Sequence, residues 1–453
     1  MNWEMFREYD IRGLVEKDLK DDVVRDLGRA FSTYVSERKG RVVSLGRDCR
    51  LSSDHLRNLL VEGMLEGGLH IIDVGIVPTP LFYFSLFKLP VDGGIMITGS
   101  HNPPEFNGFK VAWGKSTIFG EEIRYLGRVM EERRFVRGHG ELEAYGSIVD
   151  DYYAFIRKDI RVERPLRVVV DAGNGTGGFV ACPIMREMGL QVMELFCEMD
   201  GRFPNHFPDP TVEAYMQDLR EKVKREGADV GIGFDGDADR IGVVDERGEI
   251  VYGDRLMIIF ARDILHRHRG ATFVSEVKCS ELLFEDIERH GGKAIMWKTG
   301  HSLIKDKMRE TGALLAGEMS GHMFFADRYF GYDDAIYASL RLLEIMAREG
   351  RPISELLKDL KKTYVTPEIR LECPDAIKFR VVEKMKEEYK KRFKVVDIDG
   401  VRFYTDDGWG LVRPSNTQPV LVLRFEAATE DALDRMRRMV ERDLERLMAD
   451  LRV

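Results

Sequence analysis

The alternation of apolar and polar residues repeats a strand–helix–strand order three times. Apolar strands are predicted at 41–45, 168–170 and 272–274, each followed by a polar or glycine turn and a helical stretch. Glycines at 67–68, 189 and 291–292 end these helices, and second strands follow at 69–74, 190–196 and 293–297. Glycine just past a helix readily takes the left-handed conformation that ends it. The pattern predicts three similar, mixed and largely parallel α/β domains.

The C-terminal part of the chain has a different pattern. Residues 401–404 alternate between apolar and polar side chains, and Asp407-Gly408 marks a turn. Further strands are predicted at 409–412 and 420–425, and a charged helix follows from about Thr429. Consecutive strands with few helices between them indicate an α+β domain with an antiparallel sheet. The predicted domains are 1–147, 148–250, 251–363 and 364–453.

Composition and charge narrow the possible functions. The 453 residues are 44% hydrophobic, enough for a buried core, and the net charge of −9 argues against nonspecific binding to nucleic acid. A local cationic pocket for a small anion stays possible. The five cysteines form no CxxC pair, so a zinc site or disulfide framework is not expected. Without a signal sequence or membrane-spanning run, a cytoplasmic protein is expected.

Three aspartates follow the buried strand that ends at Phe234. Asp235, Asp237 and Asp239 stand at alternate positions, and such crowding needs a compensating cation. Hard oxygen ligands favour Mg²⁺ or Ca²⁺. The alternatives are a solvated acidic turn and an EF-hand. The EF-hand is rejected because its sixth position, which needs glycine, is Arg240.

Three further segments carry candidate chemistry. Ser100 lies in Thr-Gly-Ser-His-Asn-Pro-Pro after an apolar strand, where it could act as a nucleophile or phosphate carrier, although an ordinary turn is the alternative. The loop Gly-Glu-Met-Ser-Gly-His at 317–322 offers a carboxylate for sugar hydroxyls. The loop at 413–419, Arg-Pro-Ser-Asn-Thr-Gln-Pro, could surround a phosphate. Each loop could instead be a plain polar turn.

A glycine-rich turn suggests a different class of enzyme. Residues 173–178 satisfy G-x-G-x-x-G between a strand and a helix, and Glu194 lies near the downstream distance that a dinucleotide site requires. An NAD-dependent oxidoreductase is therefore the rival hypothesis, although no other chemistry for hydride transfer is visible.

Together the four segments resemble the α-D-phosphohexomutase superfamily, in particular its phosphomannomutase/phosphoglucomutase branch. The resemblance also covers Phe-Arg-Glu-Tyr-Asp-Ile-Arg-Gly at 6–13, Gly-Arg-Asp-Cys-Arg at 46–50 and Trp-Lys-Thr-Gly-His-Ser at 297–302. It implies four domains around a central cleft, each contributing one loop. In this family the turn at 173–178 is not a nucleotide site.

The resemblance also implies roles for individual residues. Ser100 would carry a phosphoryl group, and Asp235, Asp237 and Asp239 would hold Mg²⁺ together with an oxygen of that phosphate. Glu318 and Ser320, with Met319, Gly321 and His322, would bind the sugar. The phosphate that is not transferred would be held by Arg413, Ser415, Asn416 and Thr417. Further cleft residues would be Tyr9, Arg12, Lys278 and His301. Arg240 could stabilise the phosphoserine, and Lys110 and His322, with His301 behind them, are the candidate acid/base residues.

The implied reaction moves a phosphoryl group between C1 and C6 of mannose or glucose phosphates through a hexose 1,6-bisphosphate. Glucose 1,6-bisphosphate or mannose 1,6-bisphosphate would act as activator. A phosphoglucosamine mutase is the alternative within the family, and a phosphoserine hydrolase is a third class. The expected partners are small hexose phosphates, with no nucleic acid or membrane. A monomer is favoured, and a hinge is expected near residue 363.

Overall fold

The computed structural model describes residues 2–415 and 419–451. Its first sheet has the order β1-β5-β4-β2-β3-β7, in which β2 runs parallel to β3 and β4, while β5 is antiparallel to β4 and β1. The strands are β1 (Ile11–Leu14), β2 (Val42–Arg47), β3 (His70–Ile76), β4 (Gly93–Ile97), β5 (Phe106–Trp113), β6 (Ser116–Thr117) and β7 (Glu141–Ala144). The helices are η1 (Trp3–Met5), α1 (Asp21–Glu37), α2 (Ser53–Glu66), α3 (Thr79–Lys88) and α4 (Glu121–Glu131).

The second sheet has the order β12-β11-β10-β8-β9. Its strands are β8 (Arg167–Asp171), β9 (Gln191–Leu195), β10 (Val230–Phe234), β11 (Ile241–Val244) and β12 (Ile250–Val251). Its helices are α5 (Ile148–Asp159), α6 (Gly177–Glu187), η2 (Glu213–Met216) and α7 (Gln217–Glu226). The strand β10 is parallel to β8 and antiparallel to β11, so the acidic turn after β10 reverses the chain at the carboxyl end of a buried strand.

The third sheet has the order β14-β13-β15-β16. Its strands are β13 (Thr272–Glu276), β14 (Lys293–Trp297), β15 (Leu315–Gly317) and β16 (Met323–Phe325). Its helices are α8 (Gly253–Arg267), α9 (Glu281–Arg289), α10 (His301–Thr311), α11 (Ala335–Glu349) and α12 (Ile353–Leu356). The sugar-loop candidate at 317–322 connects β15 to its antiparallel neighbour β16.

The fourth sheet is antiparallel throughout its described pairings, as the sequence predicts. Its strands are β17 (Tyr364–Val365), β18 (Ile369–Glu372), β19 (Lys394–Val396), β20 (Val401–Thr405), β21 (Gly408–Pro414) and β22 (Val420–Ala427). Two helices, α13 (Asp375–Tyr389) and α14 (Glu430–Leu451), pack against it. The sequence pattern predicts α14 and three strands of this domain, but not α13 or β17–β19.

The three predicted strand–helix–strand units are confirmed as β2-α2-β3, β8-α6-β9 and β13-α9-β14, each with parallel strands. Gly68, Gly189 and Gly291 follow the three helices with φ between 83° and 87°. The finer expectation of largely parallel sheets holds from the centre to one edge of each sheet, formed by β7, β9 or β14, because β5, β11 and β16 add antiparallel strands on the other side. The four domain ranges stay predictions.

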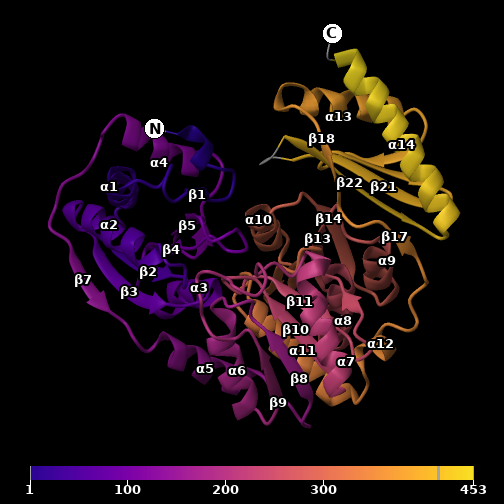
Figure 1. The fold of residues 1–453 in the computed structure, drawn as a ribbon, viewed down its shortest axis with the longest axis horizontal. Coiled ribbons are helices and arrows are strands. Elements are labelled where there is room, and N and C mark those ends of the chain that lie inside the picture. Colours follow the sequence, from indigo (N-terminus) through magenta and orange to yellow (C-terminus); the bar gives the residue numbers. More distant parts are fainter. Residues whose placement is uncertain (1, 416–418, 452–453) are drawn as a thin grey trace.

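One continuous hydrophobic core joins α3 of the first domain to the second and third domains and includes Phe82, Val168 and Ile336, while most of the first domain packs around a separate core. The fourth domain has a core of its own and meets the third through Val277, Trp409 and Leu411. Figure 1 shows α10 between the first and fourth domains, so the loop before this helix can reach both. No helix within residues 2–415 or 419–451 is long and apolar enough to cross a membrane.

Candidate active site

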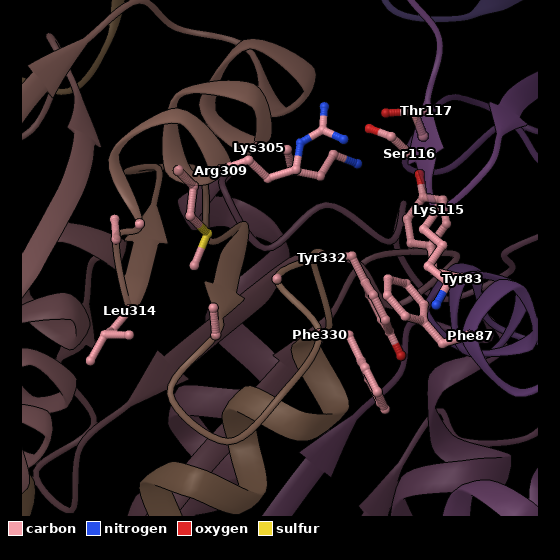
Figure 2. A pocket seen from close by; sticks show the side chains of 15 residues that line it. Tyr83, Phe87, Lys115, Ser116, Thr117, Lys305, Arg309, Leu314, Phe330 and Tyr332 are labelled. Atoms are coloured by element: carbon pink, nitrogen blue, oxygen red, sulfur yellow. The ribbon is translucent and has the colours of Figure 1, made fainter.

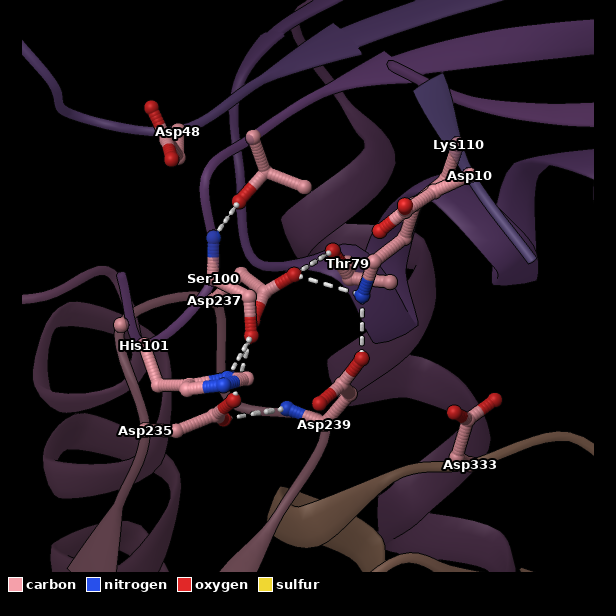
Figure 3. Close-up of polar contacts among 12 residues, drawn as sticks. Asp10, Asp48, Thr79, Ser100, His101, Lys110, Asp235, Asp237, Asp239 and Asp333 are labelled. Atoms are coloured by element: carbon pink, nitrogen blue, oxygen red, sulfur yellow. Dashed lines mark hydrogen bonds and ion pairs between the residues drawn. The ribbon is translucent and has the colours of Figure 1, made fainter. Parts of the chain in front are cut away.

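Ser100 is held in an unusual backbone conformation directly after β4. Its φ is 49°, and its residue exposure is only 3%. Its amide donates to Thr98 Oγ1 at 2.8 Å, and its Oγ donates to Asp235 Oδ2 at 2.8 Å. His101 Nδ1 lies 3.1 Å from the same hydroxyl (Figure 3). A left-handed serine is costly, so the surrounding contacts must hold it in place.

Those contacts come mainly from Arg50, whose side chain is fully buried. Its guanidinium donates to four backbone carbonyl oxygens of the serine loop, those of Ser100, Asn102, Pro103 and Phe106, at 2.5 to 2.9 Å. Gly99 leaves room for this group, because a Cβ there would lie 2.5 Å from Arg50 Cζ. The loop is therefore built around one arginine.

The three aspartates converge after β10, as expected from their spacing. Asp235, Asp237 and Asp239 are buried, and one carboxylate oxygen from each lies within 4.8 Å of the others. The amides of Asp239 and Arg240 both donate to Asp235 Oδ1 at 3.0 Å. Burial, followed by the charges of Asp239 and Asp237, holds the pKa of Asp235 well above its usual range.

Lys110 on β5 compensates the other two carboxylates. Its Nζ donates to Asp237 Oδ2 at 2.8 Å and also pairs with Asp239. Burial alone would lower the pKa of Lys110, but Asp237 and Asp239 together hold it well above its usual range. Asp237 Oδ1 and Asp239 Oδ1 are buried without a hydrogen-bond partner within the described part of the chain. This oxygen-only donor set fits a hard divalent cation.

Arg240 and His322 face each other from the second and third domains. Arg240 Nε donates to His322 Nε2 at 3.0 Å, so the ring proton of a neutral His322 lies on Nδ1. That nitrogen is 3.1 Å from Asp333 Oδ2. The His301 ring stacks 5.6 Å from His322, and burial, then Lys305, holds the pKa of His301 well below its usual range.

The sugar-loop candidate lies beside the segment before α10. Glu318 Oε1 accepts from the Gly300 amide at 2.7 Å, and Tyr9 of the first domain donates its hydroxyl to Thr299 O at 3.1 Å. The Met319 amide donates to Glu276 Oε1 at 2.9 Å, which fixes the loop from the other side. Ser320 is half-buried and Gly321 has φ 94°.

The phosphate-loop candidate is connected to the same segment through Asp399. Asp399 Oδ2 accepts from Arg413 Nε at 3.0 Å and from the Thr299 amide at 3.0 Å. Ser415 is 7% exposed, while Asn416 and Thr417 lie outside the described residues.

Lys278 and Arg12 are two more predicted cations, and Lys278 stands between two acidic groups. Lys278 Nζ lies 3.3 Å from Glu368 Oε2 and 3.6 Å from Glu276 Oε2. Burial would lower the pKa of Lys278, but Glu276 and then Glu368 raise it. Arg12 donates to Asn102 Oδ1 at 2.7 Å, two residues beyond Ser100, so it borders the serine loop.

The predicted residues thus form two neighbouring groups. One contains Ser100, Lys110, Arg240, His322 and the three aspartates, and the other contains Tyr9, Lys278, Glu318 and Arg413, with His301 between them. Five further residues of the site are not predicted from the sequence: Arg50, Thr79, His101, Asp333 and Asp399. Only Arg50 and His101 lie inside segments that the sequence marks as candidates.

Family models match nearly the whole chain. Domains I, II and III of phosphoglucomutase/phosphomannomutase, each described as alpha/beta/alpha, match residues 4–133, 150–248 and 252–364, and the C-terminal domain matches 368–443. The chain belongs to the phosphoglucomutase/phosphomannomutase family.

Individual members of this family resemble the whole chain. A phosphomannomutase/phosphoglucomutase of Pseudomonas aeruginosa is 44% identical over 99% of this chain and 97% of its own length. A phosphoglucomutase of Neisseria gonorrhoeae is 44% identical over 96% of this chain and 95% of its own. A crystal structure of a phosphoglucomutase/phosphomannomutase family protein from Burkholderia thailandensis, 43% identical, has a TM-score of 0.94 and covers 99% of this chain and 98% of that one.

Membership of this family favours the mutase over the dinucleotide hypothesis, and the glycine-rich turn agrees. The space beside that turn is filled by protein: a Cβ on Gly175 would lie 2.5 Å from Gly236 O, and one on Gly173 would lie 2.8 Å from Pro208 Cβ. Its glycines therefore allow this turn to pack against the acidic loop of the same domain. The rival hypothesis of an NAD-dependent oxidoreductase is not supported.

Proposed function

We propose that this chain is a phosphohexomutase that moves a phosphoryl group reversibly between C1 and C6 of hexose phosphates, with Ser100 as the phosphate carrier. The observation that carries the proposal is the 2.8 Å hydrogen bond from Ser100 Oγ to Asp235, one of three clustered carboxylates. A hydroxyl group at a preorganised, charge-compensated site suits phosphoryl transfer, which depends mainly on positioning and charge stabilisation.

Mg²⁺ is the proposed metal, held by Asp235, Asp237 and Asp239. The ion would neutralise charge on the transferring group. Asp237 Oδ1 and Asp239 Oδ1, which lack hydrogen-bond partners in the described chain, are the oxygens that support this assignment. Arg240 lies next to the last of these ligands in sequence and can stabilise the phosphoserine.

Lys110 and His322 are the proposed groups that move the proton at the sugar hydroxyl. Lys110 Nζ contacts two of the proposed metal ligands, so it already lies beside the reacting centre. His322 is oriented by Arg240 on one nitrogen and Asp333 on the other. His301, stacked on His322, is the third candidate.

Sugar and phosphate recognition is assigned to the second group of residues. Glu318 and Ser320, on a loop with Met319, Gly321 and His322, would bind vicinal hydroxyls, and Arg413, Ser415, Asn416 and Thr417 would bind the phosphate that is not transferred. Tyr9, Arg12, Lys278 and His301 complete the proposed cleft. A loop that binds the hydroxyl groups O3 and O4 accepts the sugar in either orientation. It makes no contact that depends on the configuration at C2, so both glucose and mannose phosphates are proposed substrates.

The proposed intermediate is a hexose 1,6-bisphosphate. Between the two half-reactions it must reorient within the cleft, so that its other phosphate can return to Ser100. Glucose or mannose 1,6-bisphosphate would therefore activate unphosphorylated enzyme. The residues of the site come from four domains of one chain, which supports a monomer.

Phosphorus NMR tests the function directly. Purified protein with Mg²⁺, a trace of glucose 1,6-bisphosphate and either glucose 1-phosphate or mannose 1-phosphate should convert the 1-phosphate signal to the 6-phosphate signal. Conversion should be lost in Ser100→Ala and on chelation of the metal. Similar rates on both sugars would establish dual specificity.

The same spectra separate the alternatives. Inactivity on both sugars with conversion of glucosamine 1-phosphate would mean a phosphoglucosamine mutase. Release of inorganic phosphate would mean a hydrolase, and unchanged spectra with every sugar would refute the proposed function. A Ser100→Ala variant as active as wild type would refute the role of the serine.

A further inference from the structure

A cavity lies between the first and third domains, and the residues that surround Ser100 do not line it. Its volume is about 480 Å³, within the range of small-molecule sites. None of its lining residues is among those assigned above to the metal, sugar or phosphate. The Thr117 and Ser302 hydroxyls, 3.2 Å apart, join the two domains at its edge.

The charge of this cavity is opposite to that of the protein. Lys115, Lys305 and Arg309 line it, and no Asp or Glu is among its described lining residues, although the whole chain carries a net charge of −9. Figure 2 shows Lys305 and Arg309 extending from α10 toward Ser116 and Thr117 of the first domain. A cationic wall built from two domains is suited to an anion that bridges them.

These cations are available to a ligand to different degrees. Lys115 is exposed and forms no ion pair within the described residues. Arg309 pairs with Asp306 on its own helix, an exposed pair of little energetic weight. Lys305 is 6% exposed and donates to Asp333 Oδ1 at 3.2 Å, so an anion would have to compete for it.

Aromatic side chains line the cavity beside the cations: Lys305 Nζ lies 4.7 Å from the centre of the Tyr83 ring, and Lys115 Nζ lies 5.1 Å from the centre of the Phe87 ring. Phe330 and Tyr332 lie with their ring planes 2° apart at 6.2 Å, and Phe87 packs against both. Tyr83 also lines the cavity, and its Oη is buried without a hydrogen-bond partner in the described chain. A buried hydroxyl without a partner is costly unless a ligand or water supplies one.

We propose that this cavity is an effector site for a small organic phosphate that carries a flat ring. The phosphate would bind Lys115, Lys305 and Arg309, the ring would lie against Phe330 and Tyr332, and Tyr83 would donate its hydroxyl to the ligand. A phosphate with a ring combines the two chemistries that the cations and the aromatic side chains of this cavity offer.

The site also has a physical connection to the reacting centre. Lys305 holds Asp333 Oδ1, and Asp333 Oδ2 is 3.1 Å from His322 Nδ1. A ligand that draws Lys305 away changes the support of His322, so it alters turnover. This regulatory step rests on the proposed mutase function, whereas binding does not.

Calorimetry with adenosine monophosphate as the probe tests binding. Ribose 5-phosphate is the matched probe without the flat ring, and adenosine is the matched probe without the phosphate. Each should bind at least about tenfold more weakly than adenosine monophosphate. The double variant Lys115→Glu/Arg309→Glu should weaken binding of adenosine monophosphate by at least about tenfold. Lys391→Glu/Arg438→Glu, an equal charge change on exposed positions of the fourth domain, should leave it unchanged.

Two further measurements separate this site from the proposed active site. Saturating glucose 6-phosphate should not displace adenosine monophosphate, and Tyr83→Phe should weaken binding of adenosine monophosphate while the protein stays folded. The probe should change kcat of the wild-type mutase by about fivefold and have no such effect on the double variant.

Several results would overturn the proposal. They are absence of binding, equal affinity in wild type and Lys115→Glu/Arg309→Glu, displacement by glucose 6-phosphate, or ribose 5-phosphate binding as tightly as adenosine monophosphate. Binding with unchanged kcat would refute the coupling through Asp333. Absence of mutase activity in wild type would refute the proposed function and leave the calorimetric result standing.

Discussion

Lys110 Nζ of the first domain lies 2.8 Å from Asp237 Oδ2 of the second, and both side chains are buried. The same ammonium pairs with Asp239, and the Thr79 hydroxyl donates to Asp237 Oδ2 at 2.6 Å. The first domain therefore supplies a positive charge to the acidic loop of the second. One lysine couples the packing of two domains to the charge of the candidate metal site.

Replacing Lys110 should destabilise the metal-free protein and abolish turnover. Lys110→Met leaves two buried carboxylates without a counter-charge, which costs about 3–5 kcal/mol of unfolding free energy. Mg²⁺ should restore part of this stability, while mutase activity should stay at least about 100-fold below wild type. Thermal unfolding with and without Mg²⁺, together with phosphorus NMR, measures both effects.

The matched control is Lys88→Met, because Lys88 forms a half-exposed pair with Asp151 at 2.8 Å. That change should cost no more than about 1 kcal/mol, with or without Mg²⁺. A metal-free Lys110→Met protein as stable as wild type would show that the lysine does not compensate the acidic loop.

The serine loop depends on the close approach of Arg50 to Gly99. In Gly99→Ala the new Cβ would lie 2.5 Å from Arg50 Cζ, so the guanidinium must move and release carbonyl oxygens of the loop. Displacing Ser100 by about 1 Å should lower kcat by about 100-fold. Steady-state kinetics and thermal unfolding measure the result.

Gly146→Ala is the control for this substitution, because nothing lies within 4 Å of a Cβ at that position. Its kcat and unfolding temperature should match wild type. If Gly99→Ala kept normal turnover, the fixed conformation of the Ser100 loop would not be needed for activity.

The sequence predicts the local units and the reactive loops better than it predicts their contacts. Strand–helix–strand units leave periodic patterns, and Asp235, Asp237 and Asp239 stand close together in the chain, so both are visible in one sequence. By contrast, Arg50 binds carbonyl oxygens about fifty residues away, and Asp399 meets Thr299 about a hundred residues away. Such contacts depend on domain packing and leave no local pattern.

The contact between the third and fourth domains should weaken in acid. Burial raises the pKa of Glu368, but Lys278, and then Arg370, lower it further, to about 2 from an ordinary 4.5. Because the folded pKa is the lower one, the stabilisation is complete above about pH 4.5 and is lost as the pH falls toward 2. At its full size this stabilisation contributes about 3 kcal/mol to the free energy of unfolding.

Urea unfolding of wild type and Glu368→Gln between pH 6 and 2.5 checks this expectation. The difference in unfolding free energy should be largest at pH 6 and should shrink as the pH falls. In a Lys278→Met background Glu368→Gln should have a smaller effect, since the main cause of the shift is gone. A difference that does not change with pH would contradict the assignment.

Arg402, whose side chain is fully buried, is one of the residues that attach the fourth domain to the third. Its Nη1 donates to Val277 O at 2.6 Å and Cys279 O at 2.8 Å, and its guanidinium lies 3.7 Å from the centre of the Trp409 ring. Arg402→Met leaves the two carbonyl oxygens of the third domain without these donors, which should loosen the interface and let the domain rotate about the predicted hinge near residue 363.

Because Arg413 lies on the fourth domain and Glu318 on the third, a looser interface should raise KM for glucose 1-phosphate by at least about tenfold, with a smaller effect on kcat. X-ray scattering without ligand should show a larger radius of gyration in Arg402→Met than in wild type, and saturating glucose 1-phosphate should reduce the difference. Arg435→Met, at an exposed pair with Asp407, should change neither KM nor the scattering curve. Unchanged scattering of Arg402→Met together with a raised KM would mean that the arginine orders the binding loops without controlling domain rotation, and the hinge near 363 would be wrong.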